Sequence, residues 1–308
     1  MRSLHDVLPR MLGSVLWCAV AGLTVFGAPP RQQAPAAPPQ LPDYVAPEIR
    51  RLSARTLRAF PAPEADQGVA ADAHHFYAVD NTQIAKYEIA SGRRVAEWAG
   101  PRNGLIRHMN SCLVDRGRLW CANSNYSLTP MGSSVEVFDA ASLRHVDSHS
   151  LGMLDEGSLT WFDRYRDGWI AGFAHYDATG GVPFKDHRFS SVVVFDAEWR
   201  RTGGWLLPQT TLDRMAPYAA SGGAIGPDGW LYLLGHDRPE MYVVARPSMG
   251  PSLIHIATID LEAEGQAFSW AQDGSRTVFT IDRRKRLVRM IELPAVQPAD
   301  PSVSLKFR

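Results

Sequence analysis

The chain has 308 residues, and its 32 Lys and Arg residues balance 32 Asp and Glu residues. A formal net charge of zero at pH 7 provides no overall attraction to nucleic acid or to an anionic membrane surface. Charge therefore argues against a nucleic-acid partner, and the small-molecule or glycan ligand that we expect is inferred from the polar loop positions described below.

The first 27 residues have the pattern of a secretory signal peptide. Arg2 and Arg10 supply a basic start, residues 11–26 are apolar and uncharged, and Val25 and Gly27 occupy small-residue cleavage positions. The apolar run is shorter than the roughly 20 residues that a membrane-spanning helix needs. We expect a protein exported to the periplasm or the extracellular space; an uncleaved segment that tethers it to a membrane is the alternative.

Residues 28–50 are rich in Pro and Ala and lack the apolar periodicity of a folded element. Such a composition cannot offset the entropy lost on ordering, so it predicts a disordered, semi-extended tether. We assign residues 51–296 to one folded domain and residues 297–308 to a C-terminal tail. We expect a monomer.

A strand–turn–strand unit recurs five times in the folded region. In each unit an apolar strand enters a tight turn containing Asp or Gly, and an apolar or aromatic strand returns. The five units are residues 69–77, 112–120, 161–170, 224–232 and 270–279. A third strand follows every unit, and successive units begin about 40–60 residues apart, which is typical of propeller blades. The pattern predicts an all-β, five-bladed β-propeller, because a sixth blade cannot be found in the sequence.

The fifth unit has no fourth strand after Ile291, whereas residues 56–61, before the first unit, have the missing alternation. We therefore expect this N-terminal strand to complete the last blade and to remove an open sheet edge.

Two cysteines, Cys112 and Cys121, flank the hairpin turn Arg116-Gly117 of the second unit. A two-residue turn places them directly opposite each other at a non-hydrogen-bonded position, where antiparallel strands approach most closely. A disulfide there suits an exported protein. The alternative is a pair of small buried hydrophobic residues.

In a propeller, the loops that enter the first strands and those that leave the second strands converge on one mouth. In this chain those positions are repeatedly polar and titratable. The expected catalytic residues are Glu156, His175, His236, Asp237 and Glu264. The expected ligand-binding residues are His108, Asn110, Asn125, Tyr126, Tyr176, Gln266 and Arg283. Arg283 has the chemistry to bind a substrate carboxylate.

Two kinds of chemistry fit these residues. Three histidines from different blades, His108, His175 and His236, would suit one divalent metal ion in the central channel. Without a metal, the carboxylates of Glu156, Glu264 and Asp237 would act around a sugar or lactone ring. The structural alternative is that these side chains hydrogen-bond to neighbouring loop backbone.

The polar positions also carry a family resemblance. The strings 108–110, 124–126, 133–136, 173–176, 221–223, 235–237 and 264–266 resemble a group of exported bacterial propeller proteins, some of which are labelled cycloisomerase-like. The resemblance implies a ring-shaped domain with a polar mouth and transfers no catalytic residue.

Two functions compete at this stage. One is a hydrolase, lyase or isomerase that acts on a lactone, a sugar acid or an oligosaccharide. The other is a non-catalytic propeller of the cell envelope that binds a ligand or a protein.

Overall fold

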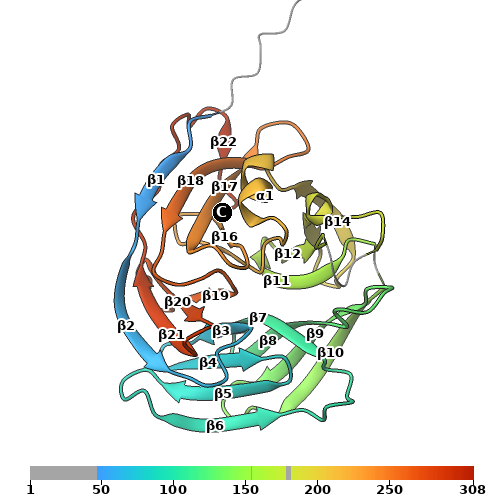
Figure 1. The fold of residues 1–308 in the computed structure, drawn as a ribbon, viewed down its shortest axis with the longest axis vertical. Helices are drawn as coiled ribbons and strands as arrows, with labels where there is room; N and C mark the ends of the chain where they lie inside the picture. The colour runs from blue at the N-terminus through green and yellow to red at the C-terminus, as the bar shows by residue number, and fades with distance from the viewer. Residues whose placement is uncertain (1–46, 154, 178–181) are drawn as a thin grey trace, which may run out of the picture. The chain divides into compact units, whose positions relative to one another are not determined.

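The computed structural model describes residues 47–153, 155–177 and 182–308 (Figure 1). The signal peptide expected at residues 1–27 and most of the tether expected at residues 28–50 lie outside the described residues. Arg50, the last residue assigned to that tether, begins the first strand, β1 (Arg50–Ser53).

Five sheets form the five blades of a β-propeller, as predicted, and the four strands of each blade pair antiparallel (Figure 1). The strands of the first three blades, from the innermost outward, are β3 (Gly68–Ala71), β4 (His75–Asp80), β5 (Gln83–Glu88) and β6 (Arg94–Ala99); β7 (His108–Asp115), β8 (Arg118–Ser124), β9 (Ser133–Asp139) and β10 (His145–Gly152); and β11 (Ser158–Tyr165), β12 (Gly168–Ala174), β13 (Ser191–Phe195) and β14 (Arg201–Leu206). The fourth blade contains β15 (Gly222–Ile225), β16 (Leu231–Leu234), β17 (Glu240–Pro247) and β18 (Ile254–Asp260). The fifth contains β19 (Phe268–Trp270), β20 (Thr277–Asp282), β21 (Leu287–Glu292) and β2 (Arg55–Pro61).

Burial follows the position of each strand in its blade. The inner strand β3 and the second strand β12 are buried along their whole length, whereas the outer strand β6 is mostly exposed. Strands near the ring axis are covered by the neighbouring blades, so both of their faces carry apolar or small residues. The cores between the blades thus fix where each inner strand begins, and with it the loops that precede the strand.

Ring closure occurs as predicted from the sequence. Strand β2 pairs antiparallel with β21, and Phe60 lies opposite Val288. The Phe60 ring is buried and its centroid is 4.9 Å from that of Phe76 in the first blade. The strand that completes the fifth blade therefore also packs against the first.

Two further strands extend the fourth blade. β1 pairs in parallel with β18, with Arg50 opposite Ala257. β22 (Ser304–Leu305), within the segment assigned to the C-terminal tail, pairs with the end of β17, and Phe307 is buried in the core.

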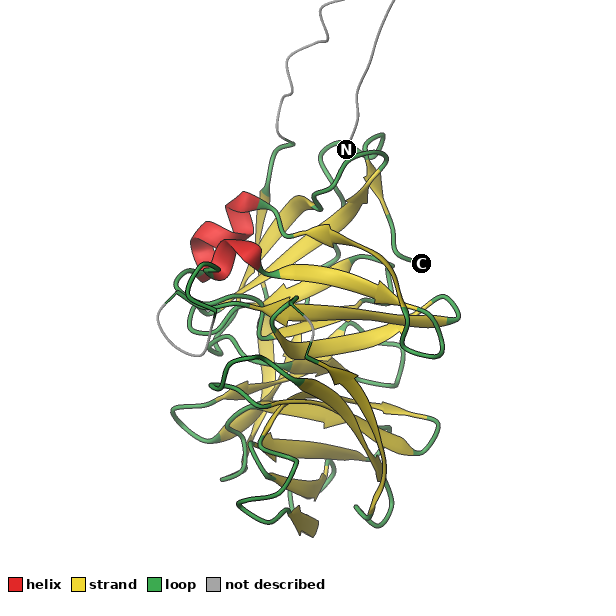
Figure 2. Cartoon of the chain, turned by 90° about the vertical axis from the view of Figure 1, so that its right-hand side faces the viewer, coloured by secondary structure: helices red, strands yellow, loops and turns green. Residues whose placement is uncertain are grey.

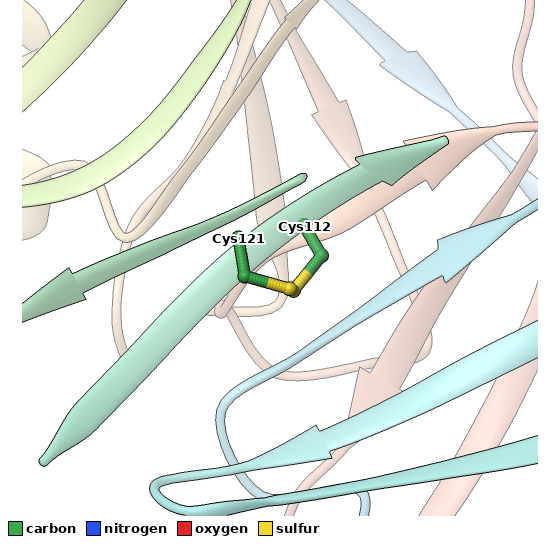
Figure 3. Close-up of a disulfide and its surroundings, with 2 residues drawn as sticks. All are labelled: Cys112 and Cys121. Atoms are coloured by element: carbon green, nitrogen blue, oxygen red, sulfur yellow. A yellow bond between two sulfur atoms is a disulfide. The ribbon is translucent and has the colours of Figure 1, made fainter. Parts of the chain in front are cut away.

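The predicted disulfide between Cys112 and Cys121 is present, with an S–S distance of 2.02 Å (Figure 3). The two residues are direct register partners on β7 and β8, and their Cα atoms are 4.1 Å apart. The connecting turn has positive φ at Arg116 and Gly117, which is the geometry of the type I′ turn expected for a two-residue hairpin.

Trp161 on β11 fills the space between the inner strands of the third and fourth blades. A Cβ added to Gly172 would lie 2.0 Å from the Trp161 indole nitrogen, and one added to Gly223 would lie 2.5 Å from the same ring system. Both glycines are therefore required by close packing against the indole. At this position an aromatic side chain of a strand serves the core between blades.

The described part of the chain contains two short helices, η1 (His187–Phe189) and α1 (Gln209–Met215). In the side view, loops gather along the two flanks of the stacked strands and α1 lies on one flank (Figure 2). Within the described ranges, neither helix has the length and apolar character needed to cross a membrane.

Candidate functional site

Seven side chains contributed by all five blades form a contiguous cluster at the ends where the inner strands begin. We call this cluster the polar mouth. Its members are Asn81, His108, Tyr126, Tyr176, Tyr218, His236 and Arg283. Each residue lies in or next to a loop that enters an inner strand or leaves a second strand. The topological expectation that these loops would meet is therefore fulfilled for this group.

A chain of hydrogen bonds fixes the tautomer of His108. The carboxylate of Asp80 accepts the side-chain N–H of Asn81 at 2.9 Å and its backbone N–H at 2.6 Å. The amide oxygen of Asn81 is thereby turned toward His108, whose Nδ1 lies 2.5 Å away. Because an amide oxygen only accepts, Nδ1 carries the proton and Nε2 of the neutral imidazole is unprotonated. This is the arrangement that an imidazole needs to act as a base through Nε2.

His108 is neutral at physiological pH. Burial lowers its pKa to about 4, with further lowering by the charges of Arg283 and His236 and an opposing effect of Asp80. Its ring lies beside that of Tyr126, with centroids 4.9 Å apart. An anion bound at Arg283 would offset that positive charge and would bring the His108 pKa back toward its ordinary value.

His236 is held between two charged partners. Its Nδ1 lies 2.5 Å from Asp237, and the Arg283 guanidinium donates to its Nε2 at 3.1 Å. The latter bond requires an unprotonated Nε2, so the proton is on Nδ1. Burial lowers the pKa of His236 despite the opposing effect of Asp237. With Nε2 occupied, His236 orients Arg283 in this geometry.

Three tyrosines form an aromatic wall. The rings of Tyr126 and Tyr176 are 5.5 Å apart, those of Tyr176 and Tyr218 are 5.2 Å apart, and Tyr218 stacks on His236 at 4.1 Å. Burial raises the pKa of Tyr176 to about 12, helped by the other two phenols. The Tyr176 phenol is therefore a neutral hydrogen-bond donor at every physiological pH.

The Arg283 guanidinium is only partly neutralised by protein. Its Nε lies 3.6 Å from Asp66, a carboxylate that pairs more closely with Arg286, at 3.0 Å. The Arg283 side chain is 39% exposed. A cation with such a distant carboxylate partner retains capacity for an anionic ligand.

His175 lies apart from the polar mouth. It is 1% exposed and lines a cavity of about 90 Å³ together with Met131 and Met153. Neither ring nitrogen has a hydrogen-bond partner among the described residues. Burial lowers the His175 pKa, and the positive charge of Lys185 adds to the effect.

The structure does not bring His108, His175 and His236 together as a ligand set. Among the described residues, one group of His, Cys, Asp or Glu donors lies within 4.8 Å of one another, and it is formed by Asp177, Asp186 and His187. Those donors already bind protein groups, since His187 pairs with Asp177 at 2.6 Å and Asp186 binds Arg188. No metal chemistry is therefore assigned to the polar mouth.

The carboxylates expected to act as a pair are separated by their ion-pair partners. Glu156 bonds to Arg201 on the outer strand β14 at 2.5 Å, and the two residues line a pocket together with other residues of β14. Glu264 pairs with Arg284 at 3.0 Å and still influences His236. Asp237 is engaged by His236, as described above. Each of the three carboxylates therefore has a partner within the protein.

The remaining expected ligand-binding residues, Asn110, Asn125 and Gln266, are either buried in the fold or hydrogen-bonded within their own loop. Asn110 lies within the inner strand β7 and Gln266 lies just before β19, and both are almost fully buried. The side chain of Asn125 closes its own loop, donating to the Pro130 carbonyl at 2.9 Å and accepting from the Gly132 N–H at 2.9 Å. That loop carries Tyr126, so Asn125 acts by positioning the aromatic wall.

Tyr218, Asn81 and Asp80 were not among the expected site residues. Tyr218 lies in the connection that enters the fourth blade, and Asp80 and Asn81 follow β4. Their loop positions were visible in the sequence, but the contacts to His236 and His108 that give them a role depend on side-chain orientation.

Comparison with solved structures supports the fold assignment. A glutaminyl cyclase from Myxococcus xanthus matches with a TM-score of 0.54 and 13% identity, over 81% of this chain and 100% of that chain. The likeness is one of fold. A hydrazine synthase chain from Kuenenia stuttgartiensis (14% identity, TM-score 0.42, 73% of this chain and 69% of that chain) and a chain of a mitotic checkpoint complex (11%, 0.40, 86% and 100%) match less well. No protein-family model and no curated protein matches the sequence.

Proposed function

We propose that the polar mouth is the active site of an enzyme that moves a proton on a small, oxygen-rich carboxylate such as a sugar acid. The observation that carries the proposal is the hydrogen-bonded chain from Asp80 through Asn81 to His108. It holds an imidazole with an unprotonated Nε2 in a cluster assembled from all five blades. Lyase and isomerase chemistry next to a carboxylate requires such a base.

Arg283, His108 and the three tyrosines act directly on the substrate in this proposal. Arg283 binds the carboxylate in a bidentate manner, and the charge of that carboxylate raises the pKa of His108 from its unliganded value. His108 Nε2 then accepts a proton from the carbon next to the carboxylate, and the electron pair of the broken C–H bond forms an enolate. The His108 imidazolium afterwards returns the proton to the product and regenerates the base. The Tyr176 phenol donates a hydrogen bond to the oxygen on which negative charge develops. The aromatic wall supplies faces against which a sugar ring packs.

The cellular location forms part of the same proposal. A disulfide persists in oxidising compartments, and Cys112–Cys121 therefore supports export to the periplasm or the cell exterior. The resemblance to exported bacterial propellers and the N-terminal sequence pattern point the same way.

A non-catalytic binding propeller is the second candidate. The low His108 pKa of about 4 favours it, because an imidazole that stays neutral to that pH is a weak base until an anion is bound. The similarity to a protein named glutaminyl cyclase does not decide between the two functions, because one fold hosts enzymes and binding proteins alike.

The test compares variants of neighbouring arginines. A panel of sugar acids, their lactones and neutral sugars is measured for binding by calorimetry and for turnover by NMR. Arg283→Gln is expected to weaken carboxylate binding about 10- to 100-fold, in line with loss of a charged hydrogen-bonded pair. Arg284→Gln, one residue along in an exposed side chain, serves as the matched control and is expected to change binding less than about twofold.

His108→Gln separates catalysis from binding. For an enzyme we expect it to lower kcat by about 10² to 10⁴ while the ligand still binds. If the unmodified protein binds a ligand through Arg283 but turns over no compound of the panel, the protein is a binding propeller instead. Equal effects of the Arg283 and Arg284 substitutions would overturn both versions of the site.

A further inference from the structure

A second cavity lies at the opposite end of the inner strands from the polar mouth. It has a volume of about 270 Å³ and is lined by residues from the second, third, fourth and fifth blades. Strand β7 connects the two sites: His108 at its start belongs to the polar mouth, and Asp115 at its end lines the cavity. Nothing in the proposed chemistry of the polar mouth uses this cavity.

Two carboxylates line this cavity, Asp115 and Asp163, and of the two Asp163 is poorly neutralised. Its side chain is 16% exposed and accepts two backbone N–H groups, those of Arg164 and Ile225, each at 2.7 Å. Burial raises its pKa above the ordinary value. Two hydrogen bonds therefore hold the carboxylate in place without supplying a full positive charge.

The neighbouring arginine does not supply that charge. The Arg164 guanidinium is directed to Asp115, at 2.6 Å, and its centre lies 3.6 Å from the centroid of the Trp169 ring. In the described ranges, the one ion pair of Asp163 is with Arg308, whose Nη2 lies 3.7 Å away.

Arg308 is loosely held. Its side chain is 52% exposed, and its guanidinium donates one long hydrogen bond, 3.5 Å, to the Arg164 carbonyl. A buried carboxylate gains more from a cation in direct, well-oriented contact than from one at this distance. A cation that contacts the Asp163 carboxylate directly can therefore replace the Arg308 guanidinium beside it.

We propose that this cavity is a second ligand site, which binds a small molecule bearing a primary amine or a guanidinium group, and that Arg308 competes with that ligand for Asp163. Phe162 and Trp270 line the same cavity and provide apolar surface for the remainder of the ligand. The volume is slightly below the roughly 300 Å³ at which sites for drug-sized ligands begin, so it suits a molecule of one ring or less.

The test uses benzylamine as the probe and benzyl alcohol as its neutral counterpart. Binding is measured by calorimetry and by ligand-observed NMR, on the full chain. Arg308→Ala removes the competitor and is expected to tighten benzylamine binding about two- to fivefold, which corresponds to the loss of one exposed ion pair. Arg308→Lys keeps a positive charge and is expected to bind benzylamine as the unmodified protein does.

Asp163→Asn in the Arg308→Ala background is expected to return benzylamine affinity to that of the unmodified protein or below. Circular dichroism and the Tm establish that each variant is folded, and the Arg308 variants keep the test decisive if the Asp163 variant is not. His108→Gln is expected to leave the affinity unchanged, because the polar mouth is a separate site.

Three results would overturn the proposal: equal affinity of the unmodified protein and Arg308→Ala, equal binding of benzyl alcohol, or loss of binding in His108→Gln. None of these results bears on turnover at the polar mouth, so the two proposals fail independently.

Discussion

Acidification should destabilise the protein through the neutral, half-buried His108. The pKa of this imidazole falls from an ordinary 6.5 to about 4 in the folded state. The unfolded chain therefore binds more protons between those values, and stability that is fully present above pH 6.5 is lost as the pH falls toward 4. At about 1.4 kcal/mol per pH unit the complete effect has an upper bound of about 3.4 kcal/mol, and about 2.5 kcal/mol of it is lost by about pH 4.5.

Solvent screening at the partly exposed ring reduces this figure, so we expect about 1 to 2.5 kcal/mol. The perturbation is His108→Gln, which removes the titrating group. The assay is guanidinium unfolding of both proteins at about pH 7.5 and about pH 4.5. The unmodified protein should lose more stability than the variant by the stated amount; His255, whose pKa is also lowered to about 4, titrates equally in both. An equal loss in the two proteins, or an NMR titration of His108 near 6.5, would refute the reasoning.

Other predictions concern the fold. Replacing Cys112 and Cys121 by Ser should lower the free energy of unfolding by about 2.5 kcal/mol, since the disulfide closes a nine-residue separation; an unchanged urea midpoint under oxidising conditions would contradict this. Phe60→Ala should cost about 3–5 kcal/mol, because the buried ring joins the last blade to the first; a loss under about 1 kcal/mol in the same urea assay would show that closure does not depend on this ring. Gly172→Ala should reduce Tm sharply because its Cβ would meet an indole nitrogen at 2.0 Å. Gly203→Ala should not, because none of the described non-neighbouring residues has an atom within 4 Å of the added Cβ; equal Tm values would count against the packing argument.

The architecture could be predicted from sequence because each blade repeats the same local signals. Alternating strands and two-residue turns are encoded within about ten residues, and the disulfide register follows from the turn alone. Strand β1 could not be predicted, since residues 50–53 have no apolar alternation and gain their partner only through parallel pairing with β18. The four residues of β1 thus lack the alternation by which residues 56–61 could be recognised as the strand that closes the ring.

The site was predictable in position but not in detail. Topology places loops from all blades at one mouth, which correctly groups His108, Tyr126, Tyr176, His236 and Arg283. It does not determine which way a loop side chain turns. That choice depends on partners supplied by other strands, and these partners direct some expected site residues away from the mouth.

Glu156 and His175 show why. Glu156 finds Arg201 on an outer strand, and His175 enters a small cavity lined by Met131 and Met153. Conversely, the role of His108 depends on Asn81, whose amide orientation is set by Asp80. Partners of this kind, such as Arg201 for Glu156 and Asn81 for His108, have no characteristic spacing in the sequence from the residues that they orient.

Because β2 closes the ring by pairing with β21, the polar mouth is complete only after the whole propeller has been synthesised. Asn81 belongs to the first blade and Arg283 to the fifth, and these two blades become neighbours only when β2 pairs with β21 near the other end of the chain. A nascent chain with four finished blades has His108 and its base-orienting partners but lacks the arginine proposed to hold the substrate. Ligand affinity should therefore be absent from every incomplete chain and should emerge in a single step when the ring closes.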